Sequence, residues 1–301
     1  MVNFAFAGSA LLLPYYLGVM EQLQELGVVN DTTSFGGISG GALTSLAGCS
    51  GANMTKTLGD FQTLQAKCTT GEFECAQSLG IIETHLLSDS FISSGALAKC
   101  GKGRVRVGMT ALNPASTGFE DAQALTVSKF FDNDDMRAAF ISSSYLSCVS
   151  GPQPYTFFRG MPVIDGGYKA DYPDICPPDG PCVRVASFVV GSNVADKPWP
   201  SLACIPLANV SIFAGEPVKF ASNTWPRSSL PNSCAYQFDH FQSPTAPHIF
   251  PGKYTKLRYT QEQWQTLSMC MSTDAEVATY MFTTGKADAE AWFAQDYATY
   301  T

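Results

Sequence analysis

The sequence has little charge, and this shortage excludes several kinds of partner. Of its 301 residues only 15% are charged, the net charge is −8, and no run of Lys or Arg could form a basic stripe. We therefore expect no nucleic-acid partner and no strong electrostatic attraction to anionic lipid. The 45% of hydrophobic residues is typical of a globular chain with a sizeable core.

Long apolar runs are also missing. The longest, from Ala10 to Met20, stops at Glu21, whereas a membrane-spanning helix needs about 20 apolar residues. Leu11-Leu12-Leu13 resembles the apolar part of a signal peptide, but the first Lys is Lys56, so the basic region in front of it is absent. We expect no transmembrane segment and interpret the leucines as part of the fold.

No two cysteines have the CxxC spacing of a zinc or redox site, so we expect no metal and no cofactor. There are nevertheless ten cysteines. Cys68/Cys75 and Cys176/Cys182 could bridge short loops, and we favour the second pair because prolines and a glycine lie between its ends. Asn-x-Ser/Thr sequons begin at Asn30, Asn53 and Asn209. Together these features favour a secreted or lumenal protein without fixing its localisation.

Strands and helices alternate along the first half of the chain. Val2–Phe6 is expected to be a buried strand, and Pro14 opens a helix that runs to about Leu26, with Gly27 as its C-cap. A second strand near residues 33–35 leads into a helix over 42–47. Further strands are expected over Arg104–Met109, Met161–Ile164 and Val183–Val190, the last in a central parallel position, and a helix over Asp134–Ser143.

This alternation predicts an α/β fold with three layers, α/β/α, around a mainly parallel sheet. We expect one domain over residues 1–301. Its motifs lie within about 2–190, followed by Pro-rich loops and two or three helices over 191–301.

Gly37-Ile38-Ser39-Gly40-Gly41 fits the pattern G-x-S-x-G between a strand and a helix. A nucleophilic serine on such a strained turn needs small neighbours, here Gly37 and Gly41, so that the backbone can close. The helix behind Ser39 directs its positive end at the site, and the Gly40 amide faces a developing oxyanion. A strand–helix turn with a capping serine has the same pattern.

Two further segments fit the same chemistry. Gly8-Ser9-Ala10 is a turn of small residues at a helix N-terminus, where exposed amides favour an anion, although a tight connection alone would need the same residues. Asp165-Gly166-Gly167 follows a strand, and strand ends line the crevice of a parallel sheet. Asp165 could therefore take the proton of Ser39 if burial raises its pKa, but Asp-Gly is also a common turn.

These blocks, in this order, resemble the patatin-like phospholipase family. The segment from Phe6 to Leu11, followed by Tyr15–Val19, is similar to the oxyanion block of its adipose triglyceride lipase branch. Gly37–Gly41 resembles the nucleophile block. Asp165-Gly166-Gly167, with Asp171-Tyr172-Pro173 beyond it, resembles the Asp-Gly-Gly block, and Ala139–Tyr145 resembles the small-residue segment before it. The resemblance covers Val2 to Pro173.

The resemblance implies a patatin-like fold and a serine lipid acyl hydrolase, a phospholipase A or lipase. It implies a Ser39–Asp165 dyad without histidine or metal, and an oxyanion hole from Gly8, Ser9, Ala10 and Gly40. The substrate would be a lipid ester at a membrane or lipid-droplet surface. The family has two or three glycines in its first block and this chain keeps only Gly8, so we expect the loop to follow a different path.

Three alternatives remain open at this point. The fold could belong to a catalytically silent lipid-binding or storage protein, or to an acyltransferase that uses the same acyl-enzyme. The order Ser39, Asp165 and then His240 or His248 is also that of an α/β-hydrolase triad, although only one strand–helix unit precedes the strand of Ser39. The sequence does not fix head group, acyl-chain length or oligomeric state.

Overall fold

The structure is a computed structural model, and it describes residues 2–72, 80, 87, 95–113, 121–146, 150, 153–188, 246–269, 272 and 274–300. The strands are β1 (Asn3–Phe6), β2 (Phe35–Ile38), β3 (Lys102–Ala111), β4 (Gln123–Lys129), β5 (Thr156–Phe158), β6 (Met161–Asp165) and β7 (Cys182–Val185). The α-helices are α1 (Leu13–Glu25), α2 (Gly40–Ser50), α3 (Met54–Thr69), α5 (Ala96–Cys100), α6 (Asn133–Ser143), α7 (Tyr172–Ile175), α9 (Gln261–Met269) and α10 (Ala275–Gln295). Short 3-10 helices are η1 (Ala10–Leu12), η4 (Gly166–Tyr168) and η8 (Tyr297–Thr299).

The described strands form one mixed sheet in the order β5-β6-β3-β2-β1-β7, with β4 beside β3. β7, β1, β2 and β3 run parallel, whereas β4, β5 and β6 are antiparallel to their neighbours. The predicted α/β class and a mostly parallel sheet are therefore confirmed. β4 and β5 were not predicted.

Among the described strands, the strand over Val183–Val190 does not take the central position expected of it. β7 ends at Val185 and is the last of the described strands in the sheet order. Among the described residues, its outer edge contacts the 248–249 segment through a bridge from Val185 to Ile249 and through backbone hydrogen bonds of Arg184 and Ala186. Val183 and Val185 are fully buried although they lie at an edge, because helices and the 246–250 segment cover that edge. The apolar run that begins at Val183 therefore predicts that the strand is buried, but it does not predict where the strand lies in the sheet.

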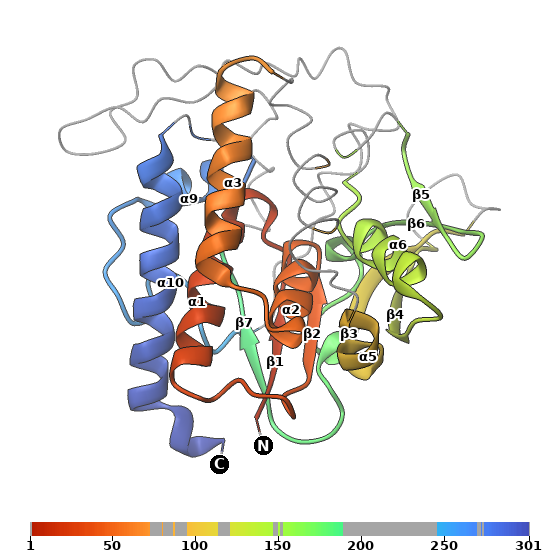
Figure 1. The fold of residues 1–301 in the computed structure, drawn as a ribbon, viewed down its shortest axis with the longest axis horizontal. Coiled ribbons are helices and arrows are strands. Elements are labelled where there is room, and N and C mark those ends of the chain that lie inside the picture. Colours follow the sequence, from red (N-terminus) through yellow and green to blue (C-terminus); the bar gives the residue numbers. More distant parts are fainter. Residues whose placement is uncertain are drawn as a thin grey trace.

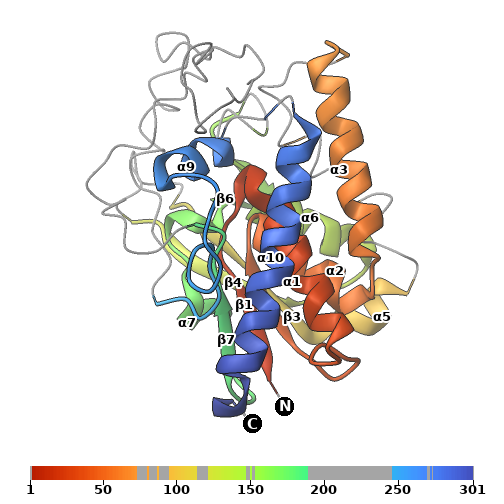
Figure 2. The ribbon, with the colours of Figure 1, turned by 90° about the vertical axis from the view of Figure 1, so that its left-hand side faces the viewer.

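The two faces of the sheet carry side chains of different size. Phe4, Phe6 and Phe35 belong to the main core, on the face that α1, α2 and α10 cover (Figures 1 and 2). The opposite face presents small residues and is covered by the single turn of α7, whose Ile175 lies directly against Gly36 and Gly108. This arrangement is compatible with three layers, with one helical layer much thinner than the other.

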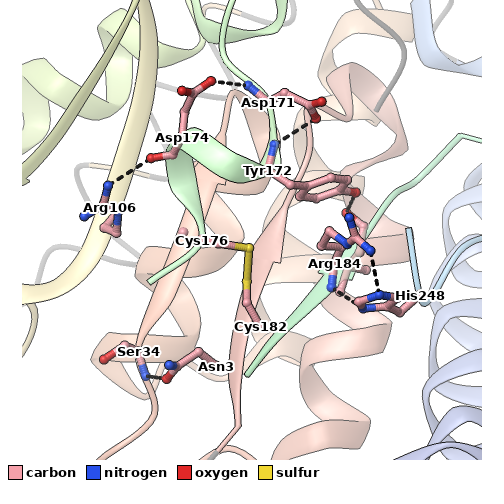
Figure 3. The surroundings of a disulfide bond; sticks show 12 residues. Asn3, Ser34, Arg106, Asp171, Tyr172, Asp174, Cys176, Cys182, Arg184 and His248 are labelled. Atoms are coloured by element: carbon pink, nitrogen blue, oxygen red, sulfur yellow. Dashed lines mark hydrogen bonds between the residues drawn. A yellow bond between two sulfur atoms is a disulfide. The ribbon is translucent and has the colours of Figure 1, made fainter. Parts of the chain in front are cut away.

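α7 is fixed by its own cap and by a disulfide. Asp171 and Asp174 form a capping box at its start, and the Cys176–Cys182 disulfide ties its end to β7, with 5.9 Å between the Cα atoms (Figure 3). The predicted Cys176–Cys182 bridge is confirmed. Cys75, of the other predicted pair, lies outside the described residues.

The N-terminal and C-terminal parts of the chain pack together through α1 and α10 (Figure 1). Gly18 of α1 and Gly285 of α10 allow the backbones to touch, because an added Cβ would lie 1.9 Å from the Phe282 carbonyl oxygen or 2.1 Å from that of Tyr15. The Tyr15 hydroxyl donates a 2.9 Å hydrogen bond to the buried Asp288. None of the described helices combines the length and apolar composition that crossing a bilayer requires.

Candidate active site

Ser39 and Asp165 come together because two strands meet end to end on β3. β4 occupies one edge of β3 over residues 107–111, so β2 and β6 must share the other edge. There, Ile38 of β2 pairs with Gly108 and Asp165 of β6 pairs with the next residue, Met109. β6 is antiparallel, contrary to the expectation of a parallel strand end, yet its carboxyl end still meets that of β2.

Ser39 adopts a strained backbone between β2 and α2, with φ 56° and ψ −131°. This region is costly for a residue with a Cβ, and such strain is concentrated at functional sites. Neighbouring glycines allow it, because a Cβ on Gly37 would lie 2.3 Å from the Gly41 carbonyl oxygen and one on Gly41 would lie 2.2 Å from that of Ala7. The turn thus has the geometry that G-x-S-x-G requires.

A buried serine on α6 holds this turn from behind. The Ser39 amide donates to Ser143 Oγ at 2.9 Å, and the Ser143 hydroxyl donates to the Gly108 carbonyl oxygen at 2.6 Å. Ser143 is fully buried. The sequence predicts a helix over Asp134–Ser143 and small residues at its end but not this role; a run of three serines after an apolar helix is a signal for buried, hydrogen-bonded hydroxyls.

Asp165 is a buried carboxylate with one free oxygen. Its Oδ1 accepts a 2.7 Å hydrogen bond from the Gly167 amide, and Oδ2 has no hydrogen-bond partner in the described part of the chain. Burial raises the pKa of Asp165 to about 7, against smaller lowering effects from the Gly167 amide and the Ser39 hydroxyl. The Ser39 hydroxyl is thus near enough to lower the pKa of the Asp165 carboxyl, although the hydroxyl and Oδ2 do not form a hydrogen bond of regular geometry.

Two glycines frame this carboxyl. Gly166 packs against β3 so closely that a Cβ there would lie 2.4 Å from the Gly108 carbonyl oxygen, and Gly167 supplies the amide bound to Oδ1. The Thr110 hydroxyl donates to the Asp165 backbone oxygen at 2.8 Å. These contacts fix the position of the carboxyl but leave Oδ2 able to accept a proton.

The Gly8-Ser9-Ala10 loop lies against the start of α2. A Cβ on Gly40 would lie 2.0 Å from Ser9 Oγ, so the two predicted oxyanion segments are in direct contact. Among the described residues, the amides of Gly8, Ser9 and Gly40 donate to no protein group. Ala10 in this loop takes a positive φ of 47°, a backbone conformation that residues other than glycine rarely adopt.

His248 takes no part in this arrangement. Its ring binds Arg184, with Nδ1 accepting from the backbone amide at 3.0 Å and Nε2 lying 3.0 Å from the guanidinium (Figure 3). Burial, and then the charges of Arg184 and Lys253, lower the pKa of His248 to about 4. His85 and His240 lie outside the described residues, so His248 alone of the predicted triad histidines is placed away from the dyad.

The neighbouring Leu11, Leu12 and Leu13 are all buried in the main core. Where the chain is described, no three His, Cys, Asp or Glu side chains gather as metal ligands. What the site does offer is a strained serine, a proton acceptor with a pKa near neutrality and amides without partners. Such a combination is suited to acyl transfer through a covalent intermediate.

No protein-family model matches this chain, and comparison with curated proteins gives no match either.

Proposed function

We propose that this chain is a serine acyl hydrolase with a patatin-like fold that cleaves fatty-acyl esters of lipids through a Ser39–Asp165 dyad. One observation carries the proposal: a buried carboxyl oxygen that has no hydrogen-bond partner among the described residues, on a group of pKa about 7, lies beside a strained serine at a helix N-terminus. A merely structural Asp-Gly turn does not need a buried acid, and a capping serine does not need a strained backbone.

In the first step the Ser39 oxygen attacks the ester carbonyl carbon while its proton passes to Asp165 Oδ2. The charge that develops on the carbonyl oxygen is stabilised by the amides of Gly8, Ser9 and Gly40, and by the N-terminal end of α2. The proton then moves from Asp165 to the leaving alcohol. Water, deprotonated by Asp165, hydrolyses the acyl-enzyme and restores both residues.

The lipid substrate is supported by the resemblance of the three motif blocks to the patatin-like family. Within that proposal, Ser143 acts as a positioning residue, since it binds the Ser39 amide and thereby holds the nucleophile without touching the ester. The Ser39 amide is occupied by this bond, which leaves the Gly40 amide as the donor from α2.

A fluorophosphonate probe and a lipid panel test the proposal. The wild type should be labelled and should release fatty acid from phospholipid, galactolipid or triacylglycerol in the presence of excess EDTA. Ser39→Ala should lose both, whereas Ser50→Ala, at the far end of the same helix, should keep both.

An unlabelled wild type that releases no fatty acid would instead favour the silent lipid-binding protein. Transfer of the acyl group to an added alcohol in preference to water would favour the acyltransferase.

A further inference from the structure

The large hydrophobic side chains that the described residues leave exposed gather at one edge of the sheet. Phe131 is 78% exposed and Phe157 is 61% exposed, and Tyr155 and Met161 are each 38% exposed. They lie on the β5–β6 hairpin and on the neighbouring segment between β4 and α6, at the side of the molecule away from α10 (Figure 1). We call these four residues the hairpin patch.

The hairpin patch is held rigidly. Arg159 and Gly160 both have positive φ, 49° and 77°, as in the tight two-residue turn that connects antiparallel strands. The Arg159 guanidinium forms two hydrogen bonds with Asp135, of 2.9 and 2.6 Å, and lies 4.3 Å from the centre of the Phe131 ring. Tyr155 packs edge-on against Phe157, with ring centres 5.4 Å apart. The aromatic rings are therefore presented to solvent by a fixed support.

The position of the patch relates it to the proposed active site. β6 pairs with Met109–Ala111, the part of β3 that continues past the end of β2, so the hairpin extends from the side of the sheet where Ser39 lies. Met161 and Asp165 begin and end the same strand, a separation of about 14 Å at 3.4 Å per residue. A surface that touches the patch is thus brought close to the site.

We propose that the hairpin patch docks the protein on a lipid surface without net charge, an inference that rests on the proposed lipid hydrolase. Met161 pairs with Phe158 and shares its face, whereas Phe157 and Tyr155 point to the other face of the hairpin. Exposed apolar side chains therefore lie on both sides of its tip and do not form the flat, continuous surface that a stable protein interface needs. Insertion of aromatic rings into a lipid interface needs no matching surface.

Charge also favours an uncharged lipid surface over an anionic one. Beside the patch, Arg159 is paired with Asp135 and Arg137 is paired with Asp134, so neither guanidinium presents an unpaired charge to an anionic surface. The net charge of −8 opposes binding to anionic lipid. Zwitterionic or neutral lipid carries no such repulsion.

A tryptophan reporter tests direct contact with lipid. In a Ser39→Ala background, which leaves vesicles intact, Phe157→Trp should shift its emission to the blue on phosphatidylcholine vesicles and be quenched by brominated lipid. Gln295→Trp, on the exposed end of α10, should show neither effect. Adding anionic lipid should not strengthen the response. An unchanged Phe157→Trp emission would overturn the proposal.

The double variant Phe131→Ser/Phe157→Ser tests the consequence for catalysis. It should bind phosphatidylcholine vesicles at least tenfold more weakly and hydrolyse vesicle esters at least tenfold more slowly, with hydrolysis of a soluble short-chain ester unchanged within twofold. Unchanged vesicle hydrolysis would remove the docking role and leave the hydrolase standing. Vesicle binding that needs the patch, in a chain without esterase activity, would support docking and refute the hydrolase. Self-association through the patch, with no vesicle response, would overturn the docking proposal.

Discussion

Asp165 shows how the surroundings of a single residue set its chemistry. The carboxyl is fully buried and has one hydrogen-bonded oxygen, and burial raises its pKa to about 7. An exposed Asp would be a weak base near neutral pH, whereas this one is matched to proton transfer there. The same burial destabilises the folded protein when Asp165 is ionised. Burial of this carboxyl therefore has one consequence for the rate of hydrolysis and another for the free energy of unfolding, and the two can be tested separately.

The pH dependence of hydrolysis should report this carboxyl. Below pH 7 Asp165 is protonated and cannot accept the Ser39 proton, so kcat/KM for a soluble ester should fall about tenfold per pH unit below an apparent pKa of about 7. Above that value the rate should level off. A profile that stays flat down to pH 5 would show that Asp165 is not the base.

Asp165→Asn should remove activity and yet stabilise the fold at neutral pH. Because the folded-state pKa is raised, the folded protein binds more protons than the unfolded chain between about pH 4 and 7, and the wild type loses about 1.4 kcal/mol of unfolding free energy per pH unit there. The variant has no such loss. Urea unfolding should show it more stable than wild type at pH 8, with the difference shrinking by pH 5.

Burial also raises the pKa of Asp288, but this residue is present in the wild type and in Asp165→Asn alike, so its contribution cancels when the two are compared. A variant less stable than wild type at pH 8 would show that Asp165 is ionised in the fold at little cost.

His248 should be dispensable for catalysis. Its ring is bound to Arg184, and its pKa of about 4 leaves it neutral at pH 7. His248→Ala should keep activity within about tenfold of wild type, a change of about 1.4 kcal/mol in the barrier. A loss of several orders of magnitude, as expected for the base of a triad, would refute the dyad.

At the scale of elements, α1 and α10 form a contact in which their backbones touch. It brings together helices from the two ends of the chain, with Gly18 and Gly285 at the points where the backbones touch. α1 follows the Gly8–Ala10 loop directly, through η1, so this contact also supports the proposed oxyanion segment. The packing of α10 against α1 thus helps to hold the proposed oxyanion segment in place, although neither helix contributes a catalytic group.

Gly285→Ala tests the contact, with Gly59→Ala as a matched control in α3. The first change places a Cβ 2.1 Å from the Tyr15 carbonyl oxygen, so the helices must separate, at a cost of about 2 kcal/mol or more. The second has no atom within 4 Å and should stabilise the helix by about 0.5–1 kcal/mol. Equal effects on urea unfolding would show that the helix contact is not tight.

At the scale of the whole molecule, disulfides join segments that the sheet alone does not hold. Each of the described cysteines is in a disulfide. Cys49–Cys100 connects the end of α2 to the end of α5 across 51 residues, whereas Cys176–Cys182 closes only 6. The first thus anchors the far end of the helix that carries Ser39 at its start.

The longer bridge should contribute more stability, because it removes more freedom from the unfolded chain. The loop-entropy relation gives about 4 kcal/mol for Cys49–Cys100 and about 2 kcal/mol for Cys176–Cys182. Cys49→Ala/Cys100→Ala should therefore unfold at lower urea than Cys176→Ala/Cys182→Ala. The reverse order would mean that the short loop over the sheet limits stability.

The sequence by itself determined the features that depend on local backbone geometry. The glycines around Ser39, the small residues at Gly8–Ala10 and the end of α1 just before Gly27, which has a φ of 69°, follow from which residues tolerate tight or positive-φ backbone. Tertiary structure decided what depends on distant partners. The antiparallel pairing of β6 with β3, the position of β7 at the end of the described sheet and the bond from Ser39 to Ser143 all arise from pairing and burial between segments far apart in the chain. The pKa of Asp165 belongs to the same group, because desolvation is a property of the folded interior and not of an Asp-Gly-Gly sequence.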